Sequence, residues 1–297
     1  MVVGGQGRLG QKLIEVLKRE TDWEVSSVVR AGIADRRGVR YFDTGSKREW
    51  KELLADIRWT PDVMVNCAAI SDVDFCETHR QEAWETNVGL TEIQVELCRK
   101  TGSKLIQLST DHVFNGEDGP YTETSIPNPI NYYGKSKLAA DNLCIQSGID
   151  CCIIRTMWLY GSIETGKPTF VDWVLGTVAQ RKRVLVAEDE IGNPTLTDDV
   201  AYGIIRVVEE SYQGILNLAG PETVSREAFA TAILKEWGFD PEMIDTTTSA
   251  ELGRRARRPL KSGLMTLKAR TSLGTKPTEI GNGLKTYRIQ TRRRLER

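Results

Sequence analysis

The chain has 297 residues, 40% of them hydrophobic and 27% charged, with a formal net charge of −1. This length and composition predict a soluble globular protein with a full core, divided into two lobes. No apolar run approaches the roughly 18 residues of a membrane span, and no signal peptide precedes the first apolar segment, so we expect a cytoplasmic protein that does not bind a membrane.

Short apolar segments alternate with longer helical patterns through the first half of the chain. They predict strands at 2–3, 24–29, 39–42, 62–67, 104–108 and 151–155. Helical patterns follow the first segment, cover about 79–100 and begin again near Tyr132. This order predicts an α/β fold, a doubly wound Rossmann-type parallel sheet covered by helices on both faces. The first strand is only Met1-Val2-Val3, so we expect either a clipped strand or a residue 1 that is internal in the natural chain.

After Arg155 the alternation loosens. Loops rich in Gly, Pro and Thr separate helical patterns near 169–181, 198–211 and 225–237. They predict a smaller C-terminal lobe over the carboxyl edge of the sheet, where open α/β folds bind ligands. The expected division is a Rossmann domain at 1–156, to which 195–218 returns, and a substrate-binding lobe formed by 157–194 and 219–297.

A glycine-rich loop lies between the first strand and the first helix. It has the pattern Gly-x-x-Gly-x-x-Gly, which allows a tight turn and lets the helix N-terminus face a pyrophosphate. Glycine turns are common, so the pattern is informative only because of its place between a strand and a helix. We expect a dinucleotide cofactor to contact Gly4, Gln6, Gly7, Arg8, Leu9 and Gly10.

Arg30 indicates which dinucleotide binds. Folds that prefer NAD usually place an acidic residue about twenty positions after the glycines, but this region holds Arg30 with no acid beside it. A guanidinium suits a 2′-phosphate, so we expect NADP(H), with NAD(H) still open. The alternative is that Arg30 is only a solvated strand end. Asp43, after the third strand, is placed to meet the adenine amino group.

Tyr133 and Lys137 are four residues apart on a predicted helix and therefore lie on one face. A neighbouring ammonium favours the phenolate, so we expect Lys137 to lower the pKa of Tyr133 toward neutrality. Thr110 closes the predicted fifth strand and could hydrogen-bond the oxygen of a substrate. The three residues predict a carbonyl reduction in which Tyr133 supplies the proton. A solvated helix face is the alternative for the Tyr–Lys pair.

Residues that other chemistries need are scarce or poorly spaced. The only histidines are His79 and His112, which argues against a histidine-rich metal centre and a Ser-His-Asp triad. The six cysteines lack metal-ligand spacing, so we predict no metal site and reduced, structural thiols. Residues 254–297 carry 14 Lys and Arg against two Glu. They could attract an anionic small ligand, but aromatic residues are not interleaved with them, so we do not expect nucleic acid to bind.

Several segments together resemble the extended short-chain dehydrogenase/reductase family, and within it the dTDP-4-dehydrorhamnose reductases. The resemblance is dense over 1–161 and thinner beyond. The matching segments are Gly4 to Gly10, Asn66-Cys67-Ala68-Ala69, Val73-Asp74, Cys76-Glu77, Asn87, Ser109 to Gly116, Pro129 to Lys137, Arg155 to Gly161, Asn193-Pro194-Thr195, Asp198-Asp199 and Leu216 to Gly220.

The resemblance implies a role for individual residues. Thr110, Tyr133 and Lys137 would be the catalytic residues, and Ala68, Ala69 and Asn87 would line the cofactor. Asp111, His112 and Trp158 would lie near the sugar, although these reductases usually have Tyr where this chain has His112. Arg258 belongs to an arginine-rich segment that precedes Pro259. It could bind a diphosphate through paired hydrogen bonds, or it could be solvated surface charge.

Three functions agree with these features. The first is an NADPH-dependent reductase of a nucleotide-linked 4-keto-6-deoxy sugar. The second is a non-catalytic NADP-binding subunit similar to the regulatory β subunit of methionine adenosyltransferase. The third is a sugar-nucleotide epimerase or another carbonyl reductase on the same fold. The strand-end sequence Ser-Thr-Asp-x-Val-Phe favours a reductase over a dehydratase, and a homodimer is a further expectation.

Overall fold

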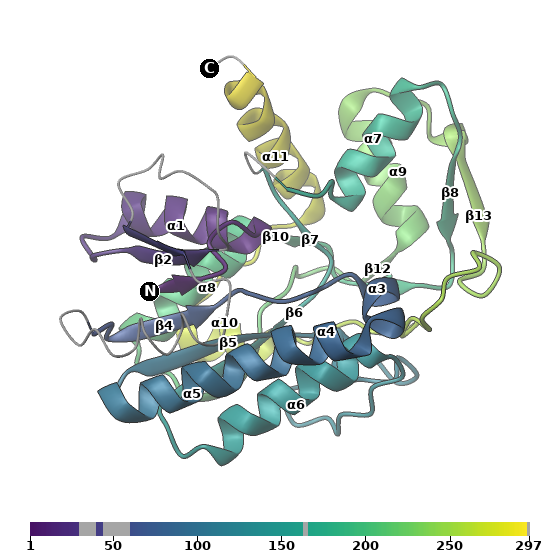
Figure 1. The fold of residues 1–297 in the computed structure, drawn as a ribbon. Coiled ribbons are helices and arrows are strands. Elements are labelled where there is room, and N and C mark those ends of the chain that lie inside the picture. The colour runs from purple at the N-terminus through teal and green to yellow at the C-terminus, as the bar shows by residue number, and fades with distance from the viewer. Residues whose placement is uncertain (30–39, 44–59, 163–165, 296–297) are drawn as a thin grey trace.

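Seven parallel strands form the central sheet, in the order β11-β6-β5-β4-β1-β2-β3 (Figure 1). The computed structural model describes residues 1–29, 40–43, 60–162 and 166–295 of the chain. The reversal of strand order at β1 is that of a doubly wound sheet, so the predicted fold class is confirmed. The strands are β1 (Val2–Val3), β2 (Ser26–Val29), β3 (Arg40–Asp43), β4 (Val63–Asn66), β5 (Lys104–Thr110), β6 (Cys151–Thr156) and β11 (Gly214–Asn217).

Side chains that alternate along each strand divide the core into two layers. Val2, Val65 and Ile106 pack with helices on one face, whereas Val3 and Met64 pack with helices on the other. The first face carries α1 (Arg8–Glu20), α8 (Thr197–Glu209) and α10 (Leu267–Leu273). The second carries α5 (Leu90–Thr101) and α6 (Tyr132–Gln146), as Figure 1 shows.

The helical pattern expected over 79–100 is not one helix. The structure divides this stretch and the residues before it into α3 (Val73–Thr78), α4 (Arg80–Trp84), a π-helical turn (Glu85–Gly89) and α5. A π-turn inserts an extra residue into the helical spacing and is frequent at functional sites. Here it carries Asn87, a residue expected near the cofactor.

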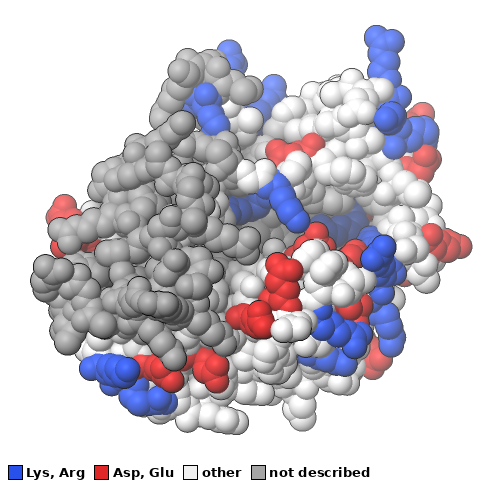
Figure 2. All heavy atoms as spheres, viewed as in Figure 1, with Lys and Arg blue, Asp and Glu red and all other residues white. Residues whose placement is uncertain are grey.

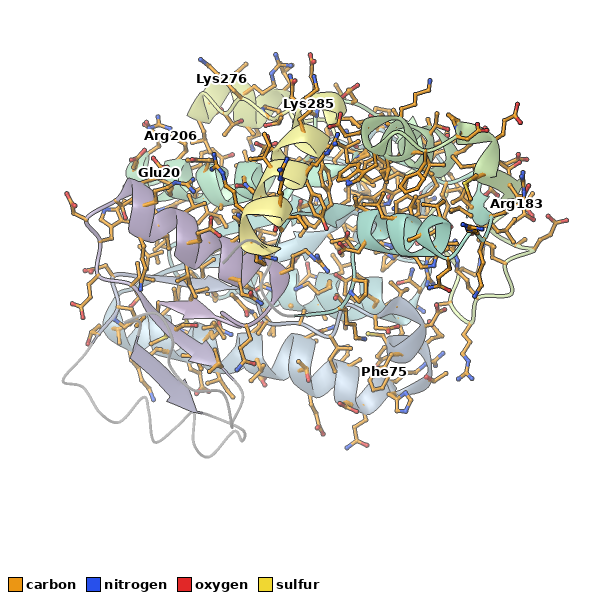
Figure 3. The ribbon with its side chains drawn as sticks, turned by 90° about the horizontal axis from the view of Figure 1, so that it is seen from above. Glu20, Phe75, Arg183, Arg206, Lys276 and Lys285 are labelled. Carbon is orange, nitrogen blue, oxygen red and sulfur yellow. The ribbon has the colours of Figure 1, made fainter. Side chains whose placement is uncertain are left out.

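The remaining elements form a smaller lobe at the carboxyl end of the sheet (Figure 1). Its core contains Val171, Val184, Phe229 and Tyr287. Seen from above, Glu20 at the end of α1 and Arg183 beside β8 lie at opposite ends of the molecule (Figure 3). The elements are β7 (Leu159–Tyr160), α7 (Phe170–Ala179), β8 (Val184–Ala187), β9 (Ile191–Gly192), β10 (Thr195–Leu196), β12 (Val224–Ser225), α9 (Arg226–Trp237), β13 (Ile244–Thr247) and α11 (Ile280–Leu295), with a 3₁₀ turn at Pro241–Met243. A second 3₁₀ turn, Asp111–Val113, directly follows β5.

Helix α10 differs from the expected division of the chain. It lies within the segment 219–297 that the sequence assigned to the lobe, but Ala269 and Leu273 pack into the core beneath α1 and α8. The C-terminal segment therefore crosses back to the sheet before α11 returns to the lobe. Across the described ranges, no helix combines the length and apolar character needed to span a bilayer.

Candidate active site

The glycine loop is built by close contact between backbone segments. Gly4 has φ of +80°, and a Cβ there would lie 2.8 Å from the Cα of Ala68, two residues after β4. A Cβ on Gly10 would overlap the carbonyl oxygen of Gly4. Gly7 is the N-cap of α1, so the first free backbone N–H groups of that helix face the loop. The loop is therefore a cradle of backbone donors suited to a pyrophosphate.

Arg8 adds a side-chain donor to this cradle. Its Nη2 donates to the carbonyl oxygen of Lys167, while its Nη1 is buried and has no hydrogen-bond partner among the described residues. Burial lowers the pKa of Arg8, and Asp172 opposes this effect. An open guanidinium donor at a helix N-terminus fits the anionic part of a dinucleotide. The other loop residues have structural roles as well, since Leu9 is buried in the core and the Gln6 carbonyl accepts from Gln11 Nε2 at 2.6 Å.

Asn87 uses its side chain to hold the loop after β4, where the cofactor is expected to lie. Its Oδ1 accepts from Ile70 N at 2.8 Å, and its Nδ2 donates to Ile70 O at 3.1 Å and to Ser136 Oγ at 2.9 Å. It thereby ties the loop that carries Ala68 and Ala69 to α6, one residue before Lys137. Arg30 lies outside the described residues, and so does the side chain of Asp43, although its backbone ends β3.

The three expected catalytic residues come together. Thr110 is the last residue of β5, and Tyr133 and Lys137 lie on the first two turns of α6. Their exposed fractions are only 5%, 9% and 2%. The Thr110 side chain lies close enough to the Tyr133 hydroxyl to favour its charged form. The structure thus places a phenol and a hydroxyl side by side at the carboxyl edge of the sheet.

Burial controls the protonation of this group. It raises the pKa of Tyr133 well above its ordinary value, and the nearby Thr110 side chain only partly offsets the rise. The expectation that Lys137 would lower the pKa of Tyr133 toward neutrality is wrong for this structure, because burial removes water from the phenol and raises its pKa. Burial also lowers the pKa of Lys137, while Asp141 favours its charged form. A neutral phenol retains the proton that a reduction consumes.

Asp141 is a buried carboxylate that the sequence analysis did not single out. It lies one turn beyond Lys137 on α6 and is fully buried. Ser109 Oγ donates to its Oδ2 at 2.6 Å, and Arg155 Nε lies 4.0 Å from the same oxygen. Burial raises the pKa of Asp141 to about 6. The four-residue spacing from Lys137 could have revealed it.

Asp111 and His112 follow Thr110 on the side of the smaller lobe. Asp111 accepts from Thr110 Oγ1 at 3.1 Å and from Ser262 Oγ of the C-terminal segment. His112 is partly exposed, and its ring meets that of Tyr133 edge to face at 5.5 Å. Two of the three residues expected near the sugar therefore lie beside Tyr133. Ser262 is separated from Asp111 by 151 positions, so sequence spacing could not have identified it.

Trp158, the third residue expected near the sugar, has an uncommon backbone conformation. Its φ is +45°, in the left-handed region that non-glycine residues rarely adopt. The guanidinium of Arg226 covers its ring at 3.6 Å, and Glu190 lies 3.6 Å from Arg226 Nε. Burial lowers the pKa of Arg226 to about 10. Packed side chains therefore hold Trp158 in the strained conformation, which is typical of a ligand-binding position.

Arg258 is occupied by an ion pair between the lobe and α3. Its Nη2 lies 2.7 Å from Asp74 Oδ2, and the backbone N–H of Ala256 donates to Asp74 Oδ1 at 2.8 Å. The side chain therefore fastens the arginine-rich segment to the Rossmann half. The face of the molecule drawn in Figure 2 is hollowed, and further Lys and Arg side chains lie inside the hollow. No cluster of His, Cys, Asp or Glu able to hold a metal ion occurs in the described part of the chain.

The doubly wound sheet, the glycine loop and the Thr110–Tyr133–Lys137 group define the chain as an NAD(P)-dependent oxidoreductase of the extended short-chain dehydrogenase/reductase type. The family model of the RmlD substrate binding domain matches residues 1–292. The chain belongs to that family, and the resemblance seen in the sequence is confirmed.

Similar proteins agree with this assignment. Spore coat polysaccharide biosynthesis protein SpsK of Bacillus subtilis is 32% identical over 97% of this chain and 95% of its own. A dTDP-4-dehydrorhamnose reductase of Mycobacterium tuberculosis is 34% identical over 68% of each chain. Among solved structures, the dTDP-4-dehydrorhamnose reductase of Bacillus anthracis in complex with NADP superimposes with a TM-score of 0.84, at 26% identity and 98% coverage of both chains.

Proposed function

We propose that this chain reduces the keto group of a nucleotide-linked 4-keto-6-deoxy sugar with NADPH, with Tyr133 as the proton donor. The observation that carries the proposal is the buried group in which Thr110, Tyr133 and Lys137 meet, with Tyr133 next to Thr110 and one helical turn from Lys137. Relatives of similar length include dTDP-4-dehydrorhamnose reductases, such as that of Aggregatibacter actinomycetemcomitans at 28% identity over 97% of both chains. This similarity supports the substrate class.

The chain's own residues account for cofactor binding. The backbone N–H groups around Gly7 and the open Nη1 of Arg8 receive the pyrophosphate. Lys137 holds the nicotinamide ribose, and Arg30 selects the 2′-phosphate of NADP(H). The cofactor, when bound, supplies the hydride for the carbonyl carbon. NAD(H) would replace NADP(H) if Arg30 contributes nothing, which the Michaelis constants of the two cofactors decide.

Two side chains act on the keto oxygen. Tyr133 donates a hydrogen bond to it and releases its proton as the oxygen becomes a hydroxyl. The Thr110 hydroxyl, which donates to Asp111 in the free protein, turns to the same oxygen. Because burial keeps the phenol neutral, the proton is present when the substrate arrives. The charged Lys137 stabilises the phenolate that forms, until solvent returns the proton.

The substrate occupies the face between the Rossmann domain at 1–156, with 195–218, and the lobe at 157–194 and 219–297. Asp111, His112 and Trp158 surround the sugar. Arg258 contributes through its ion pair with Asp74, which holds the arginine-rich segment over the site. A homodimer and a cytoplasmic location remain predictions, to be checked by sedimentation and by cell fractionation.

The test measures NADPH oxidation with a panel of nucleotide-linked 4-keto sugars. Tyr133→Phe should lower kcat by about 10²–10⁴-fold, as expected for loss of a general acid. Tyr132→Phe is the matched control, since Tyr132 is the adjacent tyrosine on the same helix and its ring lies under Arg80. Full turnover by Tyr133→Phe would refute the assigned acid. Tight NADPH binding without turnover on any sugar would instead indicate a non-catalytic binding subunit.

A further inference from the structure

Asn131 lies where the catalytic helix, the strand end and the substrate lobe meet. It is the N-cap of α6, and its Oδ1 accepts from Gly134 N at 2.8 Å. Its Nδ2 lies 2.9 Å from the carbonyl oxygen of Arg257 and 2.9 Å from His112 Nδ1. The side chain is 2% exposed. Every hydrogen-bonding position of this amide nitrogen is therefore used by the protein itself.

These contacts decide which nitrogen of His112 carries the proton. A carboxamide has one acceptor oxygen and one nitrogen with two N–H groups. The oxygen faces a backbone N–H, and the nitrogen faces a carbonyl oxygen, which can only accept. The amide orientation is thus fixed by two independent partners. Since Asn131 Nδ2 must donate to His112 Nδ1, that ring nitrogen carries no hydrogen and the hydrogen lies on Nε2.

The groups around His112 have opposing effects on its pKa. Burial lowers the pKa of His112, and the positive charge of Arg258 acts in the same direction. The carboxylates of Asp111 and Glu190 favour the charged ring, and so would a hydrogen bond in which Asn131 accepted from it. The two other partners of the amide turn its nitrogen toward the ring, so Asn131 donates instead and opposes the charge. Tyr133, which meets the ring edge to face, is neutral. An imidazolium would also turn an N–H of Nδ1 toward the N–H of Asn131, so geometry and burial agree on the neutral form.

We propose that Asn131 is a positioning residue that holds His112 as a neutral imidazole with its proton on Nε2, so that the ring offers a hydrogen-bond donor, not a cation, to an oxygen of the sugar. The contact with the sugar rests on the proposed function, whereas the state of the ring does not. His112 retains partial exposure beside Tyr133, so the residue remains within reach of a bound ligand. The partner is a hydroxyl or keto oxygen, since Nε2–H can only donate.

The state of the ring is measured by NMR in the wild-type protein. The chain has only two histidines, and the exposed His79 serves as the internal reference. We expect the ¹⁵N shifts of His112 to report a hydrogen on Nε2 and none on Nδ1 at about pH 7, with the ring still neutral where a free histidine, with a pKa of about 6.5, is half charged. A hydrogen on Nδ1, or titration together with His79, would overturn the proposal.

Asn131→Asp reverses the interaction while keeping the helix cap. Asp caps a helix as well as Asn does, but its carboxylate accepts where Asn donated, so it should raise the pKa of His112 by about 1 or more. Asn131→Ser keeps a capping hydroxyl without an N–H donor, and the pKa should rise less than with Asp. If the pKa of His112 is the same in Asn131→Asp as in wild type, Asn131 does not control the state of the ring and the inference is refuted.

Kinetics test the donor separately. His112→Gln retains an N–H donor, and His112→Phe retains only the ring shape. Loss of one hydrogen bond should raise the KM for the sugar substrate about tenfold in the Phe variant relative to Gln, with the KM for NADPH unchanged. Equal KM values in the two variants refute the donor and leave the reductase assignment intact. Absence of turnover in wild type refutes the reductase assignment and leaves the NMR result intact.

Discussion

Gly10 lies on the first turn of α1 and packs against the loop that precedes the helix. A methyl group there would overlap the carbonyl oxygen of Gly4 and lie 2.8 Å from the Cα of Gly5. These neighbours are backbone atoms, and Gly4 N is itself held by Val28 O at 2.8 Å. Rotation of a side chain therefore cannot relieve the overlap. Gly10→Ala must move either the helix or the loop that receives the cofactor.

Two opposing effects set the magnitude for Gly10→Ala. Ala stabilises a helix relative to Gly by up to about 1 kcal/mol, and an extra methyl group in a packed region costs about 1–3 kcal/mol. Because backbone atoms block the methyl group on two sides, we expect the steric cost to lie in the upper part of its range and to exceed the gain in helix propensity. The free energy of unfolding should fall by about 1–2 kcal/mol. Affinity for NADPH should weaken about tenfold or more, since the displaced loop no longer presents its N–H groups to the pyrophosphate.

Gly176→Ala is the matched control, on an exposed position within α7. A Cβ there meets nothing within 4 Å, so this variant should gain up to about 1 kcal/mol and bind NADPH as wild type does. Urea unfolding gives the stabilities, and titration of NADPH fluorescence gives the affinities. The steric reasoning fails if Gly10→Ala matches wild type in both measurements, or if Gly176→Ala loses as much as Gly10→Ala.

Two further substitutions probe ionic contacts. Asp74→Ala releases Ala256 and Arg258 and should raise the KM for the sugar about tenfold while leaving the KM for NADPH unchanged. Asp245→Ala, which breaks the exposed ion pair with Arg183, should change neither KM value. Equal effects of the two substitutions would contradict the role of Asp74 in holding the arginine-rich segment. Asp141→Asn tests the raised pKa of about 6. Because the folded protein binds this proton more tightly than the unfolded chain does, protonated Asp141 stabilises the fold at pH values below the ordinary carboxyl pKa. That stabilisation is lost as the pH rises through about 6. Between about pH 4 and about pH 7, the free energy of unfolding of wild type should therefore fall by on the order of 3 kcal/mol relative to that of Asp141→Asn. Parallel pH profiles of the two proteins would show that Asp141 does not titrate there.

The sequence predicted the features that depend on neighbouring residues. The start of α6 at Tyr132 and the strands on either side of it follow local patterns of apolar and polar residues. The turn pattern of the glycine loop is local as well, and so is the spacing of Tyr133 and Lys137. These elements were predictable because helices and strands place residues at fixed intervals.

Features that depend on distant residues were not predictable. The bond from Asn131 to Arg257 joins positions 126 apart, and α10 returns to the sheet through contacts that its own pattern does not specify. The pKa of Tyr133 depends on how much water the folded chain excludes, which spacing from Lys137 cannot reveal. The π-turn at Glu85–Gly89 is built from residues that also fit an α-helix, so the sequence indicated one continuous helix there.

Helix α6 links substrate binding to the chemistry. Its cap Asn131 binds the backbone of the lobe, and Tyr133 lies beside Thr110 at the end of β5. Ser136 accepts from Asn87, which holds the loop after β4. These positions lie within two turns of one rigid helix, so a displacement of the lobe at the cap also moves the acid relative to the carbonyl. Misplacement of a reacting group by about 1 Å can cost about 10²-fold in rate. Changes at Asn131 should therefore alter kcat and KM together, whereas changes in the glycine loop should act mainly on NADPH.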